Sequence, residues 1–393
     1  MPFYFSNLIL QFALYKKITK GKFMFYQYFN EEITVMPNFL QRKYITSIRA
    51  LAKTEKYENI KKSLNDILNE KVTADIKIKK ILANYKDIIL DAYINIQSSK
   101  SFKYSAIFEL HDDIEIKEIV NKITKGNTIL NSTIRNVSKI NDYKATKLNG
   151  AMIFTFLLDG QKIINDVIKK FKTTYSAVVK LWENEIDGNK RKFIEIDVDS
   201  VGLYFRMENN DFFGNMIGSI AGYLEQCIGL SLDPIDFFST LEYIKDMDEN
   251  GKNKSIAKVS AQKMVLDTGS QAVLDSSESE NIVLPILGDL KKIMEVNNEL
   301  FSKSPKIKQL LDSFISDTEL TSHLPWITFI WDDKIKSKKI QVKFDLSDYP
   351  YTLLNYYNHK KGRKGMNDVI ESILEAYCEI KNNKAWDNNS RVS

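Results

Sequence analysis

The sequence predicts an α+β protein. An N-terminal helical domain is followed by a mixed, largely antiparallel sheet body with helices, and by a C-terminal basic hairpin plus helix. Three observations support this fold class. Apolar residues recur every three or four positions from 38 to 98, with no glycine or proline in that stretch. Several runs between 102 and 207 have the composition of strands, and two more precede a last amphipathic run near the C-terminus.

A chain of 393 residues exceeds the size at which one hydrophobic core usually keeps growing. Its 44% hydrophobic and 27% charged residues are typical of folded domains. Composition shifts along the chain predict five parts: an aromatic and basic extension (1–36), a helical domain (37–100), an α/β body (101–266), a flexible acidic linker or insertion (267–282), and a C-terminal part with helices, the basic hairpin and a final helix (283–393).

In the first 23 residues an apolar run precedes a basic one. A secretory signal has the opposite order, and about 20 apolar residues are needed to span a bilayer. Three interpretations remain open for this segment. It is a helix docked on the body, an interfacial membrane helix, or an upstream extension with translation starting at Met24.

The stretch from 37 to 98 predicts three helices, linked near 53–55 and 71–73, with Thr54 and Thr73 as N-cap residues. Thirteen Lys and Arg against seven Asp and Glu between 37 and 100 give a net charge of +6. We therefore expect these helices to have a basic outer surface.

The body is expected to contain two strands and two helices before a central hairpin. The expected elements are a strand at 102–110, a helix to about 125, a buried strand at 147–158, a helix at 162–182 and the hairpin at 192–207. The hairpin turn is placed at Asp199 to Gly202. A helix at 211–230 follows, in which Gly214, Gly218 and Gly222 stand four residues apart and suggest close packing or a ligand.

The C-terminal half predicts further helices and strands. In order these are a helix from 233 to about 245, a strand at 258–265, a mobile acidic stretch at 267–281, helices at 285–301 and 305–314, strands at 326–333 and 338–346, and a last helix at 366–380. Cys227 and Cys378 lack the spacing of a zinc site and are expected to lie in the core. A reducing, cytoplasmic setting is the simpler expectation.

The first candidate site is a row of carboxylates at Glu195, Asp197 and Asp199. Alternate residues of a strand share one face, about 6.5 to 7 Å apart, and paired carboxylates can hold a divalent cation such as Mg²⁺ or Mn²⁺. With a nearby lysine, such a site could cleave phosphodiester bonds. The other interpretation is a solvated acidic face with Ile194 and Ile196 turned inward. The E-x-K element of restriction-like nucleases is missing after Glu195.

The second candidate site is the basic segment 334–364, which has nine Lys and Arg, two Asp and several tyrosines. Cations neutralise phosphates and aromatic rings stack on unpaired bases, so this composition suits nucleic acid. A solvated basic loop is the alternative. The expected nucleic-acid-binding residues are Lys338, Lys339, Lys343, Lys360, Lys361, Arg363 and Lys364.

No catalytic or cofactor motif of high specificity is present. The leading expectation is a non-catalytic nucleic-acid-binding accessory or regulatory protein that binds DNA or RNA without sequence specificity and without a cofactor. One alternative is a nuclease or phosphodiesterase that depends on Mg²⁺ or Mn²⁺, built on the carboxylate row. The other is a protein-interaction subunit of a larger complex, with a protein partner or as a homo-oligomer. A membrane partner is not expected.

Overall fold

The computed structural model describes most of the chain. The described residues are 26, 29–30, 32–33, 36–111, 114–125, 137–140, 148–164, 167–186, 189–201, 203–206, 211–249, 257–265, 271–275, 290, 293–321, 323–331, 340–346, 349–357 and 362–382. The N-terminal segment 1–23 with its three interpretations lies outside them. The predicted α+β class is confirmed.

The chain divides into two compact units that alternate along the sequence. Unit 1 comprises Met1–Phe102, Leu110–Glu183 and Lys192–Leu232, and unit 2 comprises Lys103–Glu109, Asn184–Arg191 and Asp233–Ser393. The division into five consecutive parts stays a prediction.

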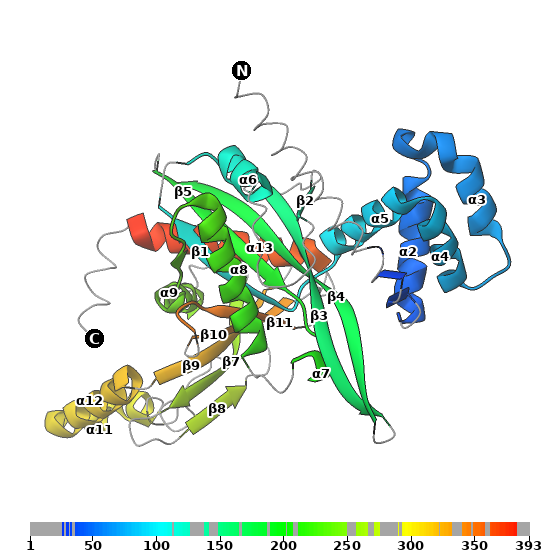
Figure 1. The fold of residues 1–393 in the computed structure, drawn as a ribbon. Helices are drawn as coiled ribbons and strands as arrows, with labels where there is room; N and C mark the ends of the chain where they lie inside the picture. Colours follow the sequence, from blue (N-terminus) through cyan, green and yellow to red (C-terminus); the bar gives the residue numbers. More distant parts are fainter. Residues whose placement is uncertain are drawn as a thin grey trace. The chain divides into compact units, whose positions relative to one another are not determined.

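Unit 1 begins with the predicted group of helices (Figure 1). They are α2 (Asn38–Leu51), the 3-10 helix η1 (Glu55–Ile60), α3 (Lys61–Asn69), α4 (Ala74–Asn84) and α5 (Lys86–Ser99). Their apolar faces form a common core with fully buried Ile48, Leu64 and Ile81. The third expected helix is divided at Tyr85, whose φ of −139° and ψ of 64° leave the helical region.

The two expected threonine caps take their positions without the expected bond. Thr54 and Thr73 do occupy the N-cap positions of η1 and α4, but neither side chain caps its helix. The Thr54 hydroxyl instead donates to the Leu51 carbonyl over 2.6 Å, so it provides a hydrogen-bond partner for a backbone carbonyl at the C-terminal end of α2.

Unit 1 continues with the strands β2 (Val137–Ile140), β3 (Leu148–Ile164), β4 (Val167–Ile186) and β5 (Asn189–Val198), hydrogen-bonded in that order. Residues 184–191, where β4 ends and β5 begins, belong to unit 2. β3 and β4 are the two long arrows side by side in Figure 1. They pair antiparallel from Leu148 opposite Trp182 to Ile164 opposite Val167. The predicted helix at 162–182 is therefore wrong, because pairing with β3 extends through it.

The second half of the expected central hairpin is also wrong. β5 ends at Val198, and the residues after the turn form a single helical turn, α7 (Leu203–Arg206), that packs on β3. Leu203 and Phe205 alternate in sequence as they would in a strand, but residues 203–206 form a helical turn that contacts β3.

The predicted glycine-containing helix is confirmed as α8 (Phe212–Ile228), and α6 (Ile116–Lys125) packs against it. Tyr223 of α8 packs edge-on against Phe154 of β3, with ring centroids 6.0 Å apart. α8 ends at Gly229, whose φ of +77° is the left-handed conformation that favours glycine. Among the described residues, no atom lies within 4 Å of a Cβ built on Gly218 or Gly222, so these two glycines do not permit a close approach.

Unit 2 is built on strands in the hydrogen-bonded order β1-β11-β10-β9-β7-β8, with β6 also paired to β1. The bounds are β1 (Tyr104–Leu110), β6 (Asp233–Pro234), β7 (Ala257–Val265), β8 (Gln271–Asp275), β9 (His323–Trp331), β10 (Ile340–Asp345) and β11 (Leu353–Tyr357). The pairs in this unit are antiparallel. The predicted strands β1, β7, β9 and β10 are confirmed.

Two strands of unit 2 were not expected. β8 lies in the stretch expected to be mobile, and β11 in a stretch expected to be a loop. The helices of this unit are α9 (Phe238–Glu249), α11 (Asn298–Ser302), α12 (Pro305–Thr321) and α13 (Gly362–Asn382). α9 begins five residues later than expected, after β6, and α13 four residues earlier. In the described part of the chain no helix is both long and apolar enough to cross a membrane.

Candidate functional site

A charged cluster lies inside unit 1, between two neighbouring strands. β4 contributes Lys180 and Trp182, and β5 contributes Glu195 and Asp197; each is at most 1% exposed. Lys180 Nζ donates to Glu195 Oε1 over 2.8 Å, and Trp182 Nε1 donates to Glu195 Oε2 over 2.7 Å. Lys180 Nζ also lies 2.8 Å from Asp197 Oδ2, an ion-pair contact. Glu195 is thus bound through both of its oxygens.

Burial sets the protonation of this cluster. Desolvation, and then the charge of Glu195, raise the pKa of Asp197 well above its ordinary value. Desolvation alone would lower the pKa of Lys180, but the two carboxyls reverse that effect and raise it. The raised pKa of Asp197 favours its neutral carboxylic acid, and the raised pKa of Lys180 favours its ammonium. Keeping Asp197 neutral reduces the number of charges in a buried site, where each isolated charge is costly.

The cluster does not fit the expected divalent-metal site. The Lys180 ammonium already occupies the position between Glu195 and Asp197, and the raised pKa of Asp197 disfavours the carboxylate that a hard cation needs. Asp199 is separate from the cluster: its Oδ2 lies 3.1 Å from Lys100 Nζ, and its Oδ1 accepts from the Ser200 amide. Among the described residues no group of three or more His, Cys, Asp and Glu side chains could hold a metal ion.

Nor is the carboxylate row a solvated face. Residues 193–198 are all buried, so both sides of this part of β5 are covered, and of the three carboxylates only Asp199, after the strand, is partly exposed. Alternation along the strand did place Glu195 and Asp197 on one side, as the sequence predicts. Their cationic partner was missed because Lys180 falls in the stretch that was expected to be a helix.

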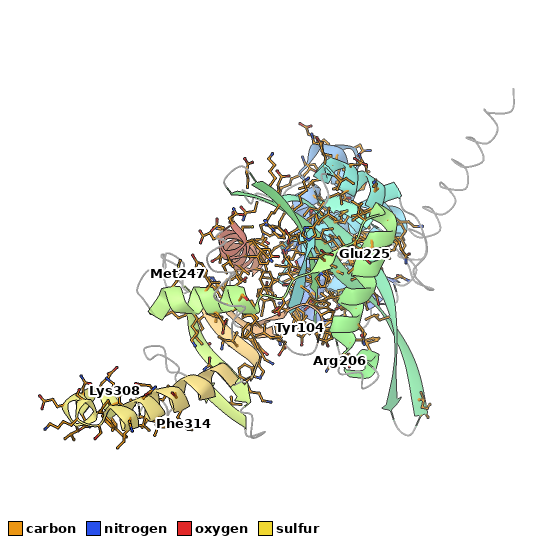
Figure 2. The ribbon with its side chains drawn as sticks, turned by 90° about the vertical axis from the view of Figure 1, so that its left-hand side faces the viewer. Tyr104, Arg206, Glu225, Met247, Lys308 and Phe314 are labelled. Carbon is orange, nitrogen blue, oxygen red and sulfur yellow. The ribbon has the colours of Figure 1, made fainter. Side chains whose placement is uncertain are left out.

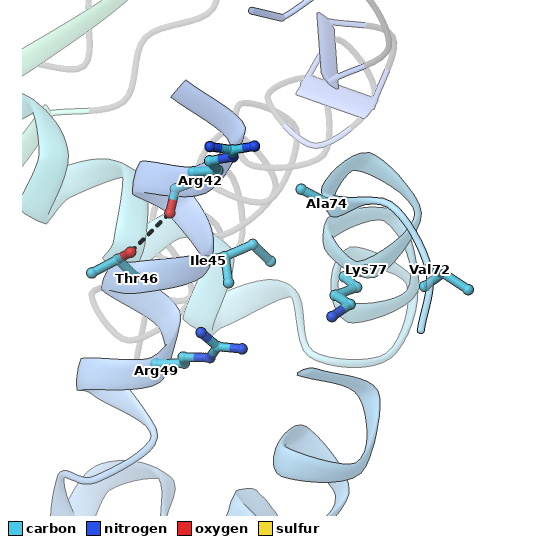
Figure 3. Close-up of a pocket in the computed structure, with 7 residues that line it drawn as sticks. All are labelled: Arg42, Ile45, Thr46, Arg49, Val72, Ala74 and Lys77. Atoms are coloured by element: carbon cyan, nitrogen blue, oxygen red, sulfur yellow. Dashed lines mark hydrogen bonds between the residues drawn. The ribbon is translucent and has the colours of Figure 1, made fainter. Parts of the chain in front are cut away.

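A second candidate site is an open hollow of about 360 Å³ among the N-terminal helices, also in unit 1. Figure 3 shows its lining, which comes from one face of α2, from the start of α4 and from the residue Val72 before α4. The lining residues are Arg42, Ile45, Thr46, Arg49, Val72, Ala74 and Lys77.

Three cations and no carboxylate line this hollow, which for convenience we call the basic hollow. Arg42 and Arg49 are exposed and Lys77 is partly buried. Lys77 Nζ donates to the Leu68 carbonyl over 2.7 Å, and Arg49 Nη2 donates to the same oxygen over 3.4 Å. Both side chains thereby provide hydrogen-bond donors for a backbone carbonyl in the last turn of α3, which has no partner within the helix. A guanidinium has five N–H donors and an ammonium three, so each cation keeps donors beyond this bond.

The remaining hydroxyl in the hollow is fixed within α2. Thr46 Oγ1 donates to the Arg42 carbonyl over 2.9 Å, the dashed line in Figure 3. The side chains of Ile45 and Ala74 supply an apolar floor next to the cations. A positive rim on a partly apolar hollow can bind a phosphate group and contact the sugar attached to it.

The structure separates the predicted nucleic-acid-binding residues. Lys338, Lys339, Lys360 and Lys361 lie outside the described residues. Lys343 forms an ion pair with Asp345 over 2.8 Å and lies 4.9 Å from the centre of the Trp326 ring. Lys364 is exposed in the first turn of α13.

Arg363 does not belong to an exposed basic surface. It is only 4% exposed, and burial lowers the pKa of its guanidinium to about 9. The physical reason is that α13 begins at Gly362, which places Arg363 on the inward side of the first helical turn. The sequence had suggested a loop at this position.

The basic character of the N-terminal helices could be predicted from the sequence, but the hollow could not. The spacing of Arg42, Thr46 and Arg49 shows that they share one face of a helix. Their approach to Lys77 depends on how α2 packs against α4, which local sequence does not specify.

The comparisons with known proteins give no family for this chain. No family model matches it. No curated protein matches it at a significant level.

Proposed function

We propose that the protein binds nucleic acid without catalysing a reaction, as a cytoplasmic accessory or regulatory component, and that the basic hollow is its main contact. The observation that carries this proposal is the composition of the hollow, in which Arg42, Arg49 and Lys77 meet with no carboxylate among the lining residues. The net charge of +6 between 37 and 100 extends the positive field around it.

The chemistry of the hollow favours contacts with the nucleic-acid backbone. Guanidinium groups bind phosphate oxygens through two parallel hydrogen bonds, and such contacts are the same for every base. The lining has no Asn or Gln side chain of the kind that reads adenine, and no aromatic ring on which a base could stack. We therefore expect binding without sequence preference, to DNA or RNA.

The C-terminal basic segment is a second contact in this proposal. Lys364 is exposed, and Lys338, Lys339, Lys360 and Lys361 add four positive charges to the same stretch of sequence. Lys343 contributes less, because Asp345 already neutralises it. Arg363 takes no part, because it is buried.

The phosphodiesterase is not kept as a second candidate function, because the carboxylates on which it was built do not fit a metal ion.

The test is fluorescence anisotropy with labelled single- and double-stranded DNA and RNA at several salt concentrations. Arg42→Glu is the informative variant, because Arg49 and Lys77 also stabilise the end of α3. We expect it to weaken binding about tenfold or more, and to reduce the slope of log K against log salt by about one, as the loss of one phosphate contact does.

Lys258→Glu is the matched control. Lys258 is exposed on β7 in unit 2, and its reversal changes the net charge of the chain by the same amount. Its affinity should stay within about twofold of the wild type, because long-range effects are screened. Equal losses for Arg42→Glu and Lys258→Glu would show a non-specific charge effect, and no binding by the wild type at low salt would end the proposal.

A further inference from the structure

Residues 293–321 form a helical hairpin in unit 2 that has its own small core. Its first arm is residues 293–302, with a helical turn at 293–296 followed by α11, and its second arm is α12. Met294 and Ile315 are buried together, with Phe301 and Leu311 packed against them. Lys308 Nζ lies 3.2 Å from Asn298 Oδ1. These contacts join residues at similar distances from the turn at 303–304, so the arms are antiparallel.

Both arms also carry apolar side chains that are more than half exposed. Figure 2 shows the side chains of the hairpin, with Lys308 and Phe314 labelled on α12. The exposed residues follow the same spacing in each arm, i, i+3 and i+7. They are Ile293 (52%), Val296 (76%) and Leu300 (63%) in the first arm, and Ile307 (53%), Leu310 (69%) and Phe314 (55%) in the second.

The two exposed rows lie on the same side of the hairpin. In each arm the row is rotated by about 100° around the helix axis from the residues of the small core, and in the same rotational sense. Antiparallel arms that face each other are related by a two-fold axis perpendicular to their common plane. The same rotation therefore brings both rows to one side, and we call this surface the outer face.

The charges beside the outer face are complementary between the arms. Near the turn the first arm carries exposed Glu295 and Glu299, and the second arm and turn carry exposed Lys303 and Lys306. If two copies were related by a two-fold axis parallel to the arms, the acidic first arm of each copy would lie over the basic second arm of the other. An isologous contact needs this self-complementarity.

We propose that the outer face binds a second copy of this chain, so that two hairpins form an antiparallel four-helix bundle. The apolar rows pack in the centre of the bundle and the Glu–Lys contacts border it, which is the usual arrangement of helical bundles. This inference is independent of the proposed nucleic-acid binding.

The exposed apolar area of the outer face is large enough for the centre of a contact between two copies. Six side chains that are more than half exposed offer on the order of 50 Å² each, so the patch covers roughly 300 Å² per copy. The largest apolar patch on a typical monomer is about 300 to 600 Å², and such a patch is often functional. A standard interface buries about 800 Å² per partner, of which the polar rim contributes a large share.

The first test is the mass of the full chain in solution, by sedimentation velocity or light scattering from low micromolar to about 100 μM. We expect a dimer for the wild type and a monomer for Leu310→Glu and for Val296→Glu. Phe39→Glu is the control, because Phe39 is 61% exposed on α2 in unit 1 and should leave the dimer unchanged. Circular dichroism checks that each variant is folded.

The second test distinguishes this pairing from any other. Glu295→Lys/Glu299→Lys makes both arms basic near the turn, and Lys303→Glu/Lys306→Glu makes both acidic, so each variant alone should dimerise at least tenfold more weakly. A one-to-one mixture should form a heterodimer, because each arm then meets its opposite charge. Weakening of the hairpin within one chain would not be rescued by mixing.

The outcomes decide the proposal. A wild type that stays monomeric at 100 μM overturns it, whether or not the outer face binds some other protein. A dimer that persists in Leu310→Glu and Val296→Glu overturns it as well, because the contact then lies elsewhere. A dimer that these variants abolish but that the mixture does not restore contradicts the pairing of the arms.

Discussion

Glu195, in the charged cluster inside unit 1, is held by two different donors from β4. Its oxygens accept from Lys180 Nζ and Trp182 Nε1, and both donors are buried with it. Buried ion pairs often stabilise a fold little compared with apolar residues of the same volume, yet losing one partner is costly. The cluster therefore fixes how β4 and β5 pair, because another register would leave a buried charge alone.

The protonation of Asp197 makes stability depend on pH. Its raised pKa means that the folded protein keeps a proton that the unfolded chain releases above about pH 4. Stability therefore falls as pH rises from there towards the folded-state pKa, by at most about 1.4 kcal/mol per pH unit. Asp197→Asn keeps a neutral side chain of the same shape and removes this contribution. We therefore expect the free energy of unfolding of Asp197→Asn, measured relative to that of the wild type, to increase as pH rises from 5 to 8.

Urea unfolding at pH 5, 6.5 and 8 would measure this difference, with an unchanged m-value showing that the unfolding transition is the same. If the difference between variant and wild type stayed constant across these pH values, Asp197 would be ionised in the folded protein.

The sequence could locate half of this cluster. Alternation along 192–198 places Glu195 and Asp197 together, because a strand has a period of two. Lys180 was assigned to a helix, and its proximity depends on the pairing of two strands that only the folded chain establishes. Burial likewise could not be predicted, since an isolated acidic row is most often solvated.

At the scale of elements, the largest error was the helix expected at 162–182. Ile164, Ile168, Phe171, Tyr175 and Val178 do recur at three and four residues, which is helical spacing. The same stretch is rich in β-branched and aromatic residues, and pairing with β3 stabilises the strand along its whole length. Long-range pairing thus overrides a local pattern. The N-terminal helices were predictable because their pattern lies entirely within each helix.

The glycines of α8 lead to a prediction about this helix. Gly218 and Gly222 lie inside it, partly or fully exposed, and an added Cβ would meet no described atom. Gly218→Ala and Gly222→Ala should each stabilise the protein by up to about 1 kcal/mol, because alanine loses less backbone freedom on folding. Gly229→Ala is the contrasting variant, and its φ of +77° should make it destabilising by about 1 kcal/mol.

Thermal and urea unfolding of the three variants would check these signs. Destabilisation by Gly218→Ala or Gly222→Ala would show that something packs against this face of α8 in solution. Close packing or a bound ligand would then explain why glycines stand four residues apart in this helix.

At the scale of the whole molecule, the two proposals make a joint prediction about affinity. If the chain dimerises through the outer face, one particle carries two basic hollows. A second hollow on the same particle binds at a high effective concentration when the nucleic acid is long enough to reach it. The wild type should therefore bind a 60-nucleotide strand at least tenfold more tightly than a 12-nucleotide strand, after correction for the number of sites.

Leu310→Glu separates the two effects. As a monomer it should bind the 12-nucleotide strand as the wild type does and lose most of the gain on the long strand. Arg42→Glu should weaken binding to both strands and leave the dimer intact, because Arg42 and the outer face lie in different units. Anisotropy on both strands, with the mass of each protein measured in the same buffer, would give both results. An equal loss on the short strand for Leu310→Glu would mean that the hairpin itself contacts nucleic acid, and the helices of unit 1 would no longer suffice as the binding surface.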